Sequence, residues 1–419
     1  MILVMSVIFW GAVVFLLLKL YRRESSDLKQ YFWPGLIAKV VAGVCLGLVY
    51  IYYYQVGDTF GFFNDAQRVV NHYQDNPLNY LHFLWAGNET FSIAAQLINI
   101  EERSMFMVKL LSLATLVSFD NYWVASVGFS IVSFLGCWYC LKKVNLHFPH
   151  GRIAAVISFL FIPSFLFWSS GVIKESMSIG ALMVLAGSYI MVFARDKVKW
   201  WEGILAIVAV WILWSLKYYW IALFLPSVLA TLIATKLVSR FVKNYSRISE
   251  SIIWAILFCF IVLLASNIHP NFYLSRFLLV IVDNYNAYSL ASENDPAVHF
   301  SNLQASWTSI VANSPWALFS GLYRPFIFES STIFQFFISI ENTLLMLLSL
   351  YNLKYISSAW KSPYRLLIIS TLVYIVLLAI FLTLSTPNFG TLSRYKVGFT
   401  PFLFFLVLYQ PCKIIFKKN

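Results

Sequence analysis

The chain has 419 residues, of which 60% are hydrophobic and only 11% are charged, and its formal net charge is +12. Soluble domains carry close to a quarter charged residues, so this composition excludes an ordinary soluble globular protein. Apolar runs of about 18 or more residues recur along the sequence, which predicts an all-α polytopic membrane bundle and not a barrel of short alternating strands.

Eleven apolar runs are expected to cross the membrane. They are 2–20, 33–54, 122–141, 152–169, 176–194, 203–216, 219–237, 252–267, 333–352, 365–385 and 396–411. The apolar stretch 104–118 is short and contains Lys109, so we interpret it as an interfacial or half-inserted helix, with a twelfth span left open. The first run lacks a basic n-region and a small-residue cleavage site, which favours a retained helix over a signal peptide.

Positive charge orients these spans. Alternate loops hold most of the 30 Lys and Arg residues, and we also assign Lys39, near the start of the second span, to their side. By the positive-inside rule this side is cytoplasmic, which puts the N-terminus outside and the C-terminus in the cytoplasm. Basic loops facing an anionic leaflet explain the net charge, so no nucleic-acid partner is indicated. We expect a multi-pass protein of a bacterial inner (plasma) membrane with its active site facing outward.

Nine cations fall on the outer side, where two long loops, 55–121 and 268–332, are expected. These cations are Arg68, Arg103, Lys109, Lys174, Lys217, Arg276, Arg324, Arg394 and Lys396. Some of them are explained by snorkelling or by pairing with acids. Their number favours an outward-facing site for a phosphate-bearing molecule.

Other chemistry is poorly supported. Cys137 and Cys140 match a C-x-x-C pattern, but they lie in an apolar run and are interpreted as small buried hydrophobes. There is no Walker motif, no Rossmann glycine fingerprint and no internal repeat, which argues against nucleotide-driven chemistry and weakens a transporter hypothesis.

The first constellation is "GDTFGFFNDA" at 57–66, which follows the second span. If 59–72 is helical, Asp65, Arg68 and His72 lie on one face, and Phe60, Phe62 and Phe63 seat the helix in the membrane interface. The alternative is structural: Asp58 would be an N-cap and Asp65 would pair with Arg68.

The second constellation is "SSGVIKES", in which Lys174 and Glu175 open a span. An acid in the first helical turn complements the helix dipole, but a lysine there is disfavoured. We therefore expect Lys174 to be held by a ligand or an ion pair.

The third constellation is "SRYK" at 393–396, between the last two spans. Arg394 can bind phosphate oxygens in a bidentate manner, and Lys396 adds a point charge beside Tyr395. Arg276 and Arg324 in the second long loop are secondary candidates. Glu341 lies inside a span and is expected to face the bundle and find a partner.

Together these features resemble the GT-C superfamily, integral membrane glycosyltransferases that use polyprenyl-phosphate-linked sugars. The resemblance rests on "YYYQVGDTFGFFNDA" in the first outer loop, "SSGVIKES" in the next, the long loop 268–331, and "SRYKVGFTPF" before a late helix. It implies a donor lipid, a glycan, lipid or protein acceptor, and inverting transfer. The sequence departs from the superfamily in having no D-x-D and in its extra first helix.

The chemistry of such a transfer assigns roles to these residues. Asp58 is our first choice and Asp65 our second for the base that activates the acceptor hydroxyl. Arg394, Lys396 and Lys174, with Tyr395, would stabilise the leaving phosphate. Glu175, Arg68 and His72 would orient the acceptor or a divalent cation (Mg or Mn), whose requirement is left open.

The resemblance also suggests a domain division. An N-terminal helix and cytoplasmic loop (1–32) would precede a seven-helix module (33–267), the long outer loop (268–332) and a C-terminal three-helix segment (333–419). The competing hypotheses are an O-antigen or polysaccharide polymerase or ligase, which would use Arg276, Arg324 and Arg394 on a lipid diphosphate, and a non-enzymatic lipid-linked-oligosaccharide flippase or transporter.

Overall fold

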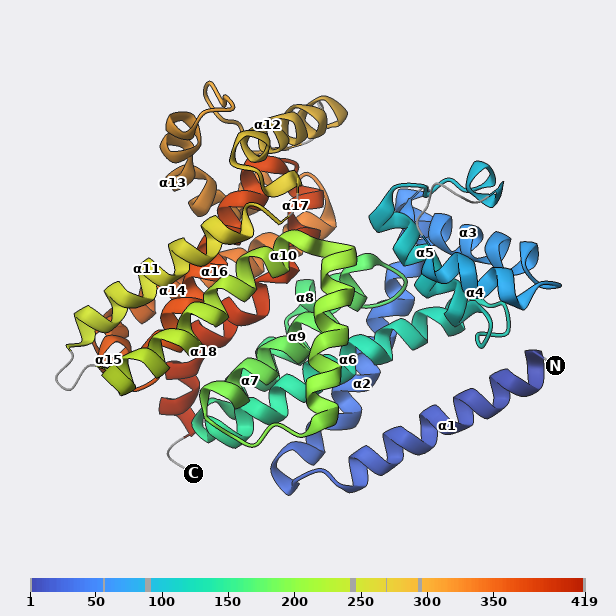
Figure 1. Ribbon diagram of the computed structural model, residues 1–419, viewed down its shortest axis with the longest axis horizontal. Coiled ribbons are helices and arrows are strands. Elements are labelled where there is room, and N and C mark those ends of the chain that lie inside the picture. Colours follow the sequence, from blue (N-terminus) through green and yellow to red (C-terminus); the bar gives the residue numbers. More distant parts are fainter. Residues whose placement is uncertain are drawn as a thin grey trace. The chain divides into compact units, whose positions relative to one another are not determined.

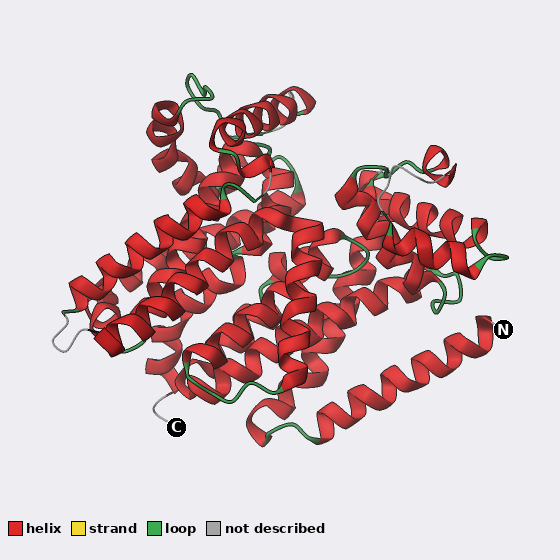
Figure 2. Ribbon diagram, in the orientation of Figure 1, coloured by secondary structure: helices red, strands yellow, loops and turns green. Residues whose placement is uncertain are grey.

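The computed structural model describes residues 2–55, 57–86, 92–241, 246–268, 270–292 and 296–416. It is 84% helical, and it contains no strand within these ranges apart from an isolated bridge between Ala297 and Asn388 (Figure 2). Eight of its helices are long and apolar enough to cross a membrane, or nine if one bent pair counts as a span. The expected all-helical class is confirmed, and the length and composition of these helices are consistent with a multi-pass membrane protein.

Two compact units divide the chain, and helices α6, α9 and α10 contribute to both (Figure 1). The first unit comprises Met1–Leu146, Phe159–Ser188 and Lys199–Tyr218, and the second comprises His147–Ser158, Tyr189–Val198 and Tyr219–Asn419. The grouping of 33–267 into one seven-helix module remains a prediction.

The helices that lie in or begin in the first unit run from the N-terminus to α10. They are α1 (Ile2–Arg22), α2 (Ser26–Val49), the π-helix η1 (Tyr50–Tyr54), α3 (Asp58–His72), α4 (Pro77–Trp85), η3 (Ser92–Gln96), α5 (Glu102–Thr115), α6 (Tyr122–His147), α8 (Pro163–Trp168), α9 (Lys174–Phe193) and α10 (Trp200–Phe241). Small residues allow close crossings here: a Cβ at Gly136 of α6 would lie 2.2 Å from the Gly180 carbonyl oxygen of α9.

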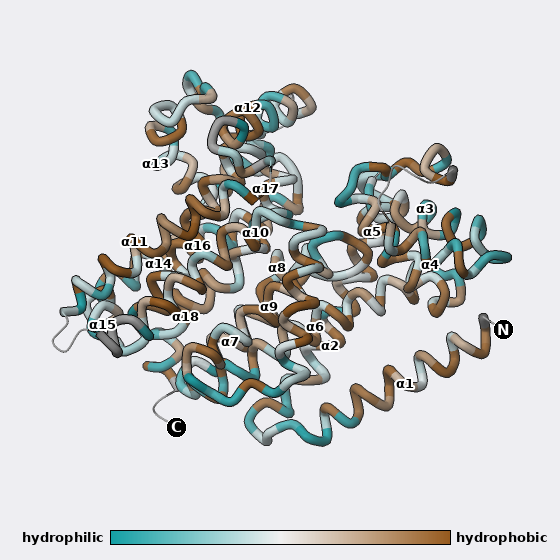
Figure 3. Tube along the Cα trace, viewed as in Figure 1, coloured by the Kyte–Doolittle hydropathy of each residue, from teal (hydrophilic) through white to brown (hydrophobic). Residues whose placement is uncertain are grey.

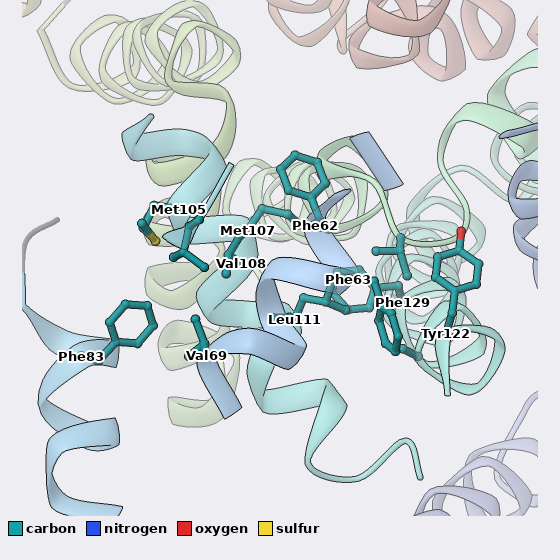
Figure 4. Close-up of a cluster of buried hydrophobic side chains, with 14 of the residues drawn as sticks. Phe62, Phe63, Val69, Phe83, Met105, Met107, Val108, Leu111, Tyr122 and Phe129 are labelled. Atoms are coloured by element: carbon teal, nitrogen blue, oxygen red, sulfur yellow. The ribbon is translucent and has the colours of Figure 1, made fainter. Parts of the chain in front are cut away.

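A cluster of buried side chains joins α3, α4, α5 and α6 within the first unit (Figure 4). Phe62 and Phe63 belong to this cluster and are 1% and 5% exposed. The expectation that these two rings seat α3 in the membrane interface is therefore wrong, because they pack against protein. Phe60 stacks on Tyr122 with 4.2 Å between ring centroids.

The helices that lie in or end in the second unit follow the same apolar pattern. They are η4 (Pro149–Gly151), α7 (Arg152–Val156), the C-terminal part of α10, α11 (Arg247–Ala265), η6 (Pro270–Phe272), α12 (Leu274–Ala291), α13 (Trp307–Tyr323), η7 (Ile327–Glu329), α14 (Ile333–Asn352), η8 (Leu353–Tyr355), α15 (Ile356–Lys361), α16 (Arg365–Ser385), α17 (Phe389–Tyr395), η9 (Lys396–Gly398) and α18 (Thr400–Phe416). Figure 3 shows that α11, α14 and α16 are largely hydrophobic along their lengths.

Four expected spans are not simple separate helices. The region 152–169 consists of α7, a π-helix (Ile157–Phe161) and α8, because Ile162 is extended before Pro163. The runs 203–216 and 219–237 lie in α10, whose backbone leaves helical geometry at Lys217. The last run, 396–411, belongs to a pair of helices bent by 67°.

Candidate functional site

The first acid of the "GDTFGFFNDA" segment begins α3. Gly57 is the N-cap residue with φ 157°, and a Cβ there would come within 2.4 Å of the Tyr50 ring. Glycine is therefore required at this turn by both conformation and space. Asp58 is the first helical residue and is exposed. The helix expected at 59–72 is therefore confirmed. The structural alternative placed the N-cap at Asp58, but the N-cap is Gly57, one residue earlier.

Asp65 has a different environment, because its carboxylate is fully buried. It accepts hydrogen bonds from the backbone amides of Ile98 and Asn99 (3.1 and 2.9 Å to Oδ2) and from Asn99 Nδ2 (2.8 Å). Arg68 pairs with Oδ1 at 3.2 Å, as the structural alternative expected. Asp65 therefore fastens the 96–99 segment to α3, and its acceptor capacity is largely used. His72, also expected on this face, is exposed and contacts the Tyr73 ring.

Five ionised side chains from three helix ends form what we call the charged cluster: Glu101, Arg103, Lys174, Glu175 and Lys217. Glu101 immediately precedes α5 and Arg103 lies in its first turn. Arg103 Nη2 lies 2.5 Å from Glu101 Oε1. Lys217, at the backbone break in α10, pairs with the buried Glu175 at 2.7 Å. Three cations and two carboxylates thus lie at one end of the first unit.

Lys174 connects the members of the charged cluster. Its ammonium group donates a 2.8 Å hydrogen bond to Ser104 Oγ and interacts electrostatically with Glu101, Glu175, Lys217 and Arg103. The expectation that an ion pair or a ligand holds Lys174 is consistent with these acidic neighbours. Lys174 Nζ also lies 5.3 Å from the centroid of Phe62, which is one helical turn from Asp58 on α3.

Neighbouring cations hold Glu101 of the charged cluster ionised. Burial raises the pKa of Glu101, but the hydrogen bond and charge of Arg103 together with the charge of Lys174 lower it below its ordinary value. Arg103 in turn lies over the Tyr218 ring at 5.6 Å. The exposed Glu102, which lies between Glu101 and Arg103 in the sequence, adds a third carboxylate beside the three cations.

Helix N-termini add positive potential to this region. The N-termini of α5 and α9 meet through the Ser104–Lys174 bond, and the N-termini of α3 and α6 meet through a 2.7 Å bond between Thr59 and Tyr122. Backbone N–H groups at a helix N-terminus attract anions. Four helix N-termini and three cations at this end of the first unit make it suited to a negatively charged group.

The basic residues predicted from "SRYK" lie in the second unit, where two of the predicted binding residues already have structural partners. Lys396 is buried and donates to the backbone carbonyls of Leu322 and Arg324 (3.4 and 3.1 Å) and to Asn342 Oδ1 (3.3 Å). It thus caps the C-terminal end of α13, where a cation is favoured. Arg324 forms a two-point salt bridge with Glu329.

The remaining candidates of the second unit are less enclosed. Arg394 and Tyr395 are half-buried on α17, and the Tyr395 hydroxyl lies 3.5 Å from that of Tyr288. Arg276 is exposed on α12. Glu341 is partly buried and interacts electrostatically with Lys396, which agrees with the partner expected for an acid inside a span.

Sequence reasoning found only part of this arrangement. It selected Lys174 and Glu175 and counted Arg103 and Lys217 among the nine outer cations, but it assigned no role to those two cations and did not mention Glu101. Glu101 precedes α5, Arg103 lies in its first turn, and Lys217 interrupts α10. A charged residue at the edge of an apolar run was the feature of the sequence that could have identified them. In the described ranges, no group of three or more His, Cys, Asp or Glu side chains could hold a metal ion.

The fold and this cluster define the class at a coarse level: an all-helical protein whose long apolar helices fit multi-pass membrane insertion, with ionised groups gathered at helix ends. Comparison with known proteins does not narrow that class. No protein-family model matches the chain, and neither a curated protein nor a solved structure matches it.

Proposed function

We propose that the chain is a membrane glycosyltransferase that moves a sugar from a polyprenyl-phosphate-linked donor to an acceptor hydroxyl on the outer face of the membrane. The observation that carries the proposal is the charged cluster, in which Arg103, Lys174 and Lys217 adjoin the N-termini of α5 and α9. A lipid phosphate held at the ends of apolar helices needs such a cationic field, since its negative charge develops as the sugar departs. The resemblance to the GT-C superfamily supports the same reading.

Asp58 is the proposed general base. It is exposed at the start of α3, and Phe62, one turn away, contacts Lys174. An exposed carboxylate can reach an acceptor hydroxyl, whereas the buried Asp65 is occupied by backbone amides. The proposed reaction inverts the anomeric carbon: the acceptor oxygen forms the new glycosidic bond, its proton passes to Asp58, and the bond to the lipid phosphate breaks.

The donor phosphate is proposed to bind Lys174 and Arg103. Both side chains are partly accessible, and Arg103 is 39% exposed. Lys217 is buried against Glu175 and acts by holding the cluster together. In the second unit, Arg394 and Tyr395 remain proposed phosphate-binding residues, while Lys396 is committed to the end of α13.

A polysaccharide polymerase or ligase is the second candidate. It would depend on Arg276, Arg324 and Arg394, but the two-point bond to Glu329 leaves Arg324 little capacity for a lipid diphosphate. A flippase would move lipid-linked glycans without breaking a glycosidic bond. Release of free polyprenyl phosphate therefore separates the transferase proposal from both alternatives.

The test uses the full chain in nanodiscs with a panel of polyprenyl-phosphate-linked hexoses and measures release of polyprenyl phosphate. Asp58→Asn is expected to abolish release while binding of polyprenyl phosphate persists, and Lys174→Met is expected to weaken that binding. The matched controls are Asp75→Asn, another exposed acid of the same loop, and Lys142→Met, which removes a cation paired with Glu24. Full turnover in Asp58→Asn would disprove the assignment of Asp58, and full turnover in Asp65→Asn as well would exclude both acids as the base.

A further inference from the structure

Helix α4 lies outside the candidate spans and is fixed at both ends. Asn76 Oδ1 accepts a 3.1 Å hydrogen bond from the Asn79 amide at its N-terminus, and Pro77 occupies the first helical turn. At the other end, Lys109 of α5 donates a 2.6 Å hydrogen bond to the Ala86 carbonyl. A cap at the start and a cation at the end stabilise this nine-residue helix in one place.

One face of α4 packs against the first unit. Phe83 is 1% exposed and belongs to the buried cluster of Figure 4, and its ring lies 5.5 Å from that of Tyr73. Tyr80 shares a 3.0 Å hydrogen bond with Ser112 of α5. These contacts fix the rotation of α4 about its own axis, and they decide which side chains point away from the protein.

The opposite face of α4 carries three apolar side chains that the described part of the chain leaves exposed. Leu78, Leu81 and Trp85 are 77%, 60% and 86% exposed. Their i, i+3, i+7 spacing aligns them in one stripe along the helix. Burying a large apolar side chain contributes about 1.5–3 kcal/mol, so three of them in water would be a substantial penalty.

This stripe continues onto a candidate membrane span. The Trp85 ring lies 6.4 Å from that of Trp211, which is on the part of α10 within the first unit. Trp211 is 47% exposed and Ile207, one turn away, is 71% exposed, and both lie in the candidate span Trp200–Lys236. Trp211 precedes the backbone break at Lys217 by six residues, or about 9 Å of helix, so it lies close to the end of the first segment of α10.

We propose that α4 lies in the plane of the membrane interface, with Leu78, Leu81 and Trp85 inserted among the lipids of one leaflet. The occupant of the stripe is bilayer lipid, because the exposed surface of a membrane span is covered by acyl chains and the stripe adjoins such a surface. Tryptophan is favoured at this depth because its ring is apolar while its indole N–H can reach polar headgroups. The inference is independent of the proposed glycosyl transfer.

Spin labelling of the full chain tests the placement. The exposed cysteines are removed by Cys45→Ser and Cys259→Ser, while Cys137, Cys140 and Cys412 are buried. A nitroxide is then attached at Leu81→Cys and, as the matched control, at Asn79→Cys, an exposed polar position on the same helix. The protein is reconstituted in vesicles of phosphatidylethanolamine and phosphatidylglycerol, and collision rates with oxygen and with a water-soluble nickel chelate are measured.

The label at position 81 is expected to collide more with oxygen than with nickel, and the ratio is expected to reverse at position 79. Nickel-dominated collisions at both positions would overturn the proposal, since the stripe would then face water. Protection of position 81 from both reagents would also overturn it, because a second copy or another protein would then cover the stripe.

Discussion

The Lys217 ammonium donates a 2.7 Å hydrogen bond to Oε1 of Glu175, and both side chains are almost completely buried. Lys217 is also the residue at which α10 departs from helical geometry, with φ −143° and ψ 58°. The ion pair therefore joins the N-terminus of α9 to the break in α10. Two of the nine cations assigned to the outer side, Lys174 and Lys217, are explained by this meeting of helix ends.

Breaking the buried pair should be costly, whereas replacing both partners should not. Lys217→Met or Glu175→Met alone is expected to lower the free energy of unfolding by about 3–5 kcal/mol, because the remaining charge stays buried without its partner. The double variant is expected to recover most of that loss. Denaturant unfolding in detergent measures the three values, and strictly additive losses would contradict a direct coupling.

The Glu101–Arg103 pair is more exposed than the Lys217–Glu175 pair and is expected to contribute less to stability. Its side chains are 59% and 39% exposed. Arg103→Met is therefore expected to change the free energy of unfolding by no more than about 1 kcal/mol. A larger loss would mean that Arg103 contributes to folding through its contact with the Tyr218 ring.

The two acids of α3 should separate into a catalytic and a structural residue. Asp65→Asn weakens hydrogen bonds from two backbone amides and a side-chain amide to a buried charge, so it is expected to cost about 1.5–3 kcal/mol. Asp58→Asn is expected to cost less than about 1 kcal/mol, because the Asp58 carboxylate is exposed in the first turn of α3. Unfolding and donor turnover are measured on the same preparations.

Two results would contradict these roles of Asp58 and Asp65. Loss of turnover in Asp65→Asn at unchanged stability would exchange the two roles. Equal destabilisation by both substitutions would show that Asp58 also holds the fold, and its effect on turnover would no longer identify a base.

Local patterns predicted much of the fold. Long apolar runs identified the helices, and the glycine and acid at 57–58 identified the start of α3. The hydrophobic and charge patterns gave the wrong environment for side chains whose surroundings come from distant parts of the chain. Phe62 and Phe63 are as apolar as lipid-facing rings, so sequence could not show that α5 and α6 cover them. Lys396 resembled a phosphate ligand because the carbonyls of Leu322 and Arg324 are distant in sequence.

Lys39 is another residue whose burial the sequence did not reveal. Sequence reasoning assigned it to the cytoplasmic side, but it lies in the middle of the Ser26–Tyr54 span and is 1% exposed. Its ammonium contacts Ser169 Oγ and lies 4.8 Å from the centroid of Phe165. The helix begins seven residues earlier than the expected span, so Lys39 lies well inside the helix and not near its start.

This placement predicts that Lys39 is dispensable for stability. Lys39 forms no salt bridge with the residues that the structure describes, and a buried charge without a counter-ion is unfavourable. Lys39→Met is expected to leave the melting temperature unchanged or raise it. Ser169→Ala in the parent chain is expected to lower it, and this loss should shrink when combined with Lys39→Met. A large destabilisation by Lys39→Met alone would contradict the prediction and indicate a bound counter-ion.

The Arg324–Glu329 bridge predicts a stability that depends on acid pH. Burial raises the pKa of Glu329, but hydrogen bonds from Arg324 and the Phe326 amide, with the Arg324 charge, lower it below its ordinary value of 4.5. A carboxyl whose folded-state pKa is lowered contributes stability above its unfolded-state pKa and loses that contribution as the pH falls through the folded-state pKa. The melting temperature of the parent chain should therefore fall below pH 4.5 more steeply than that of Glu329→Gln. Arg324→Met should likewise make the melting temperature fall less steeply at acid pH, although it also removes packing on Trp316 and Phe389. If the melting temperatures of the parent and Glu329→Gln fall equally steeply below pH 4.5, this bridge contributes nothing to the pH dependence.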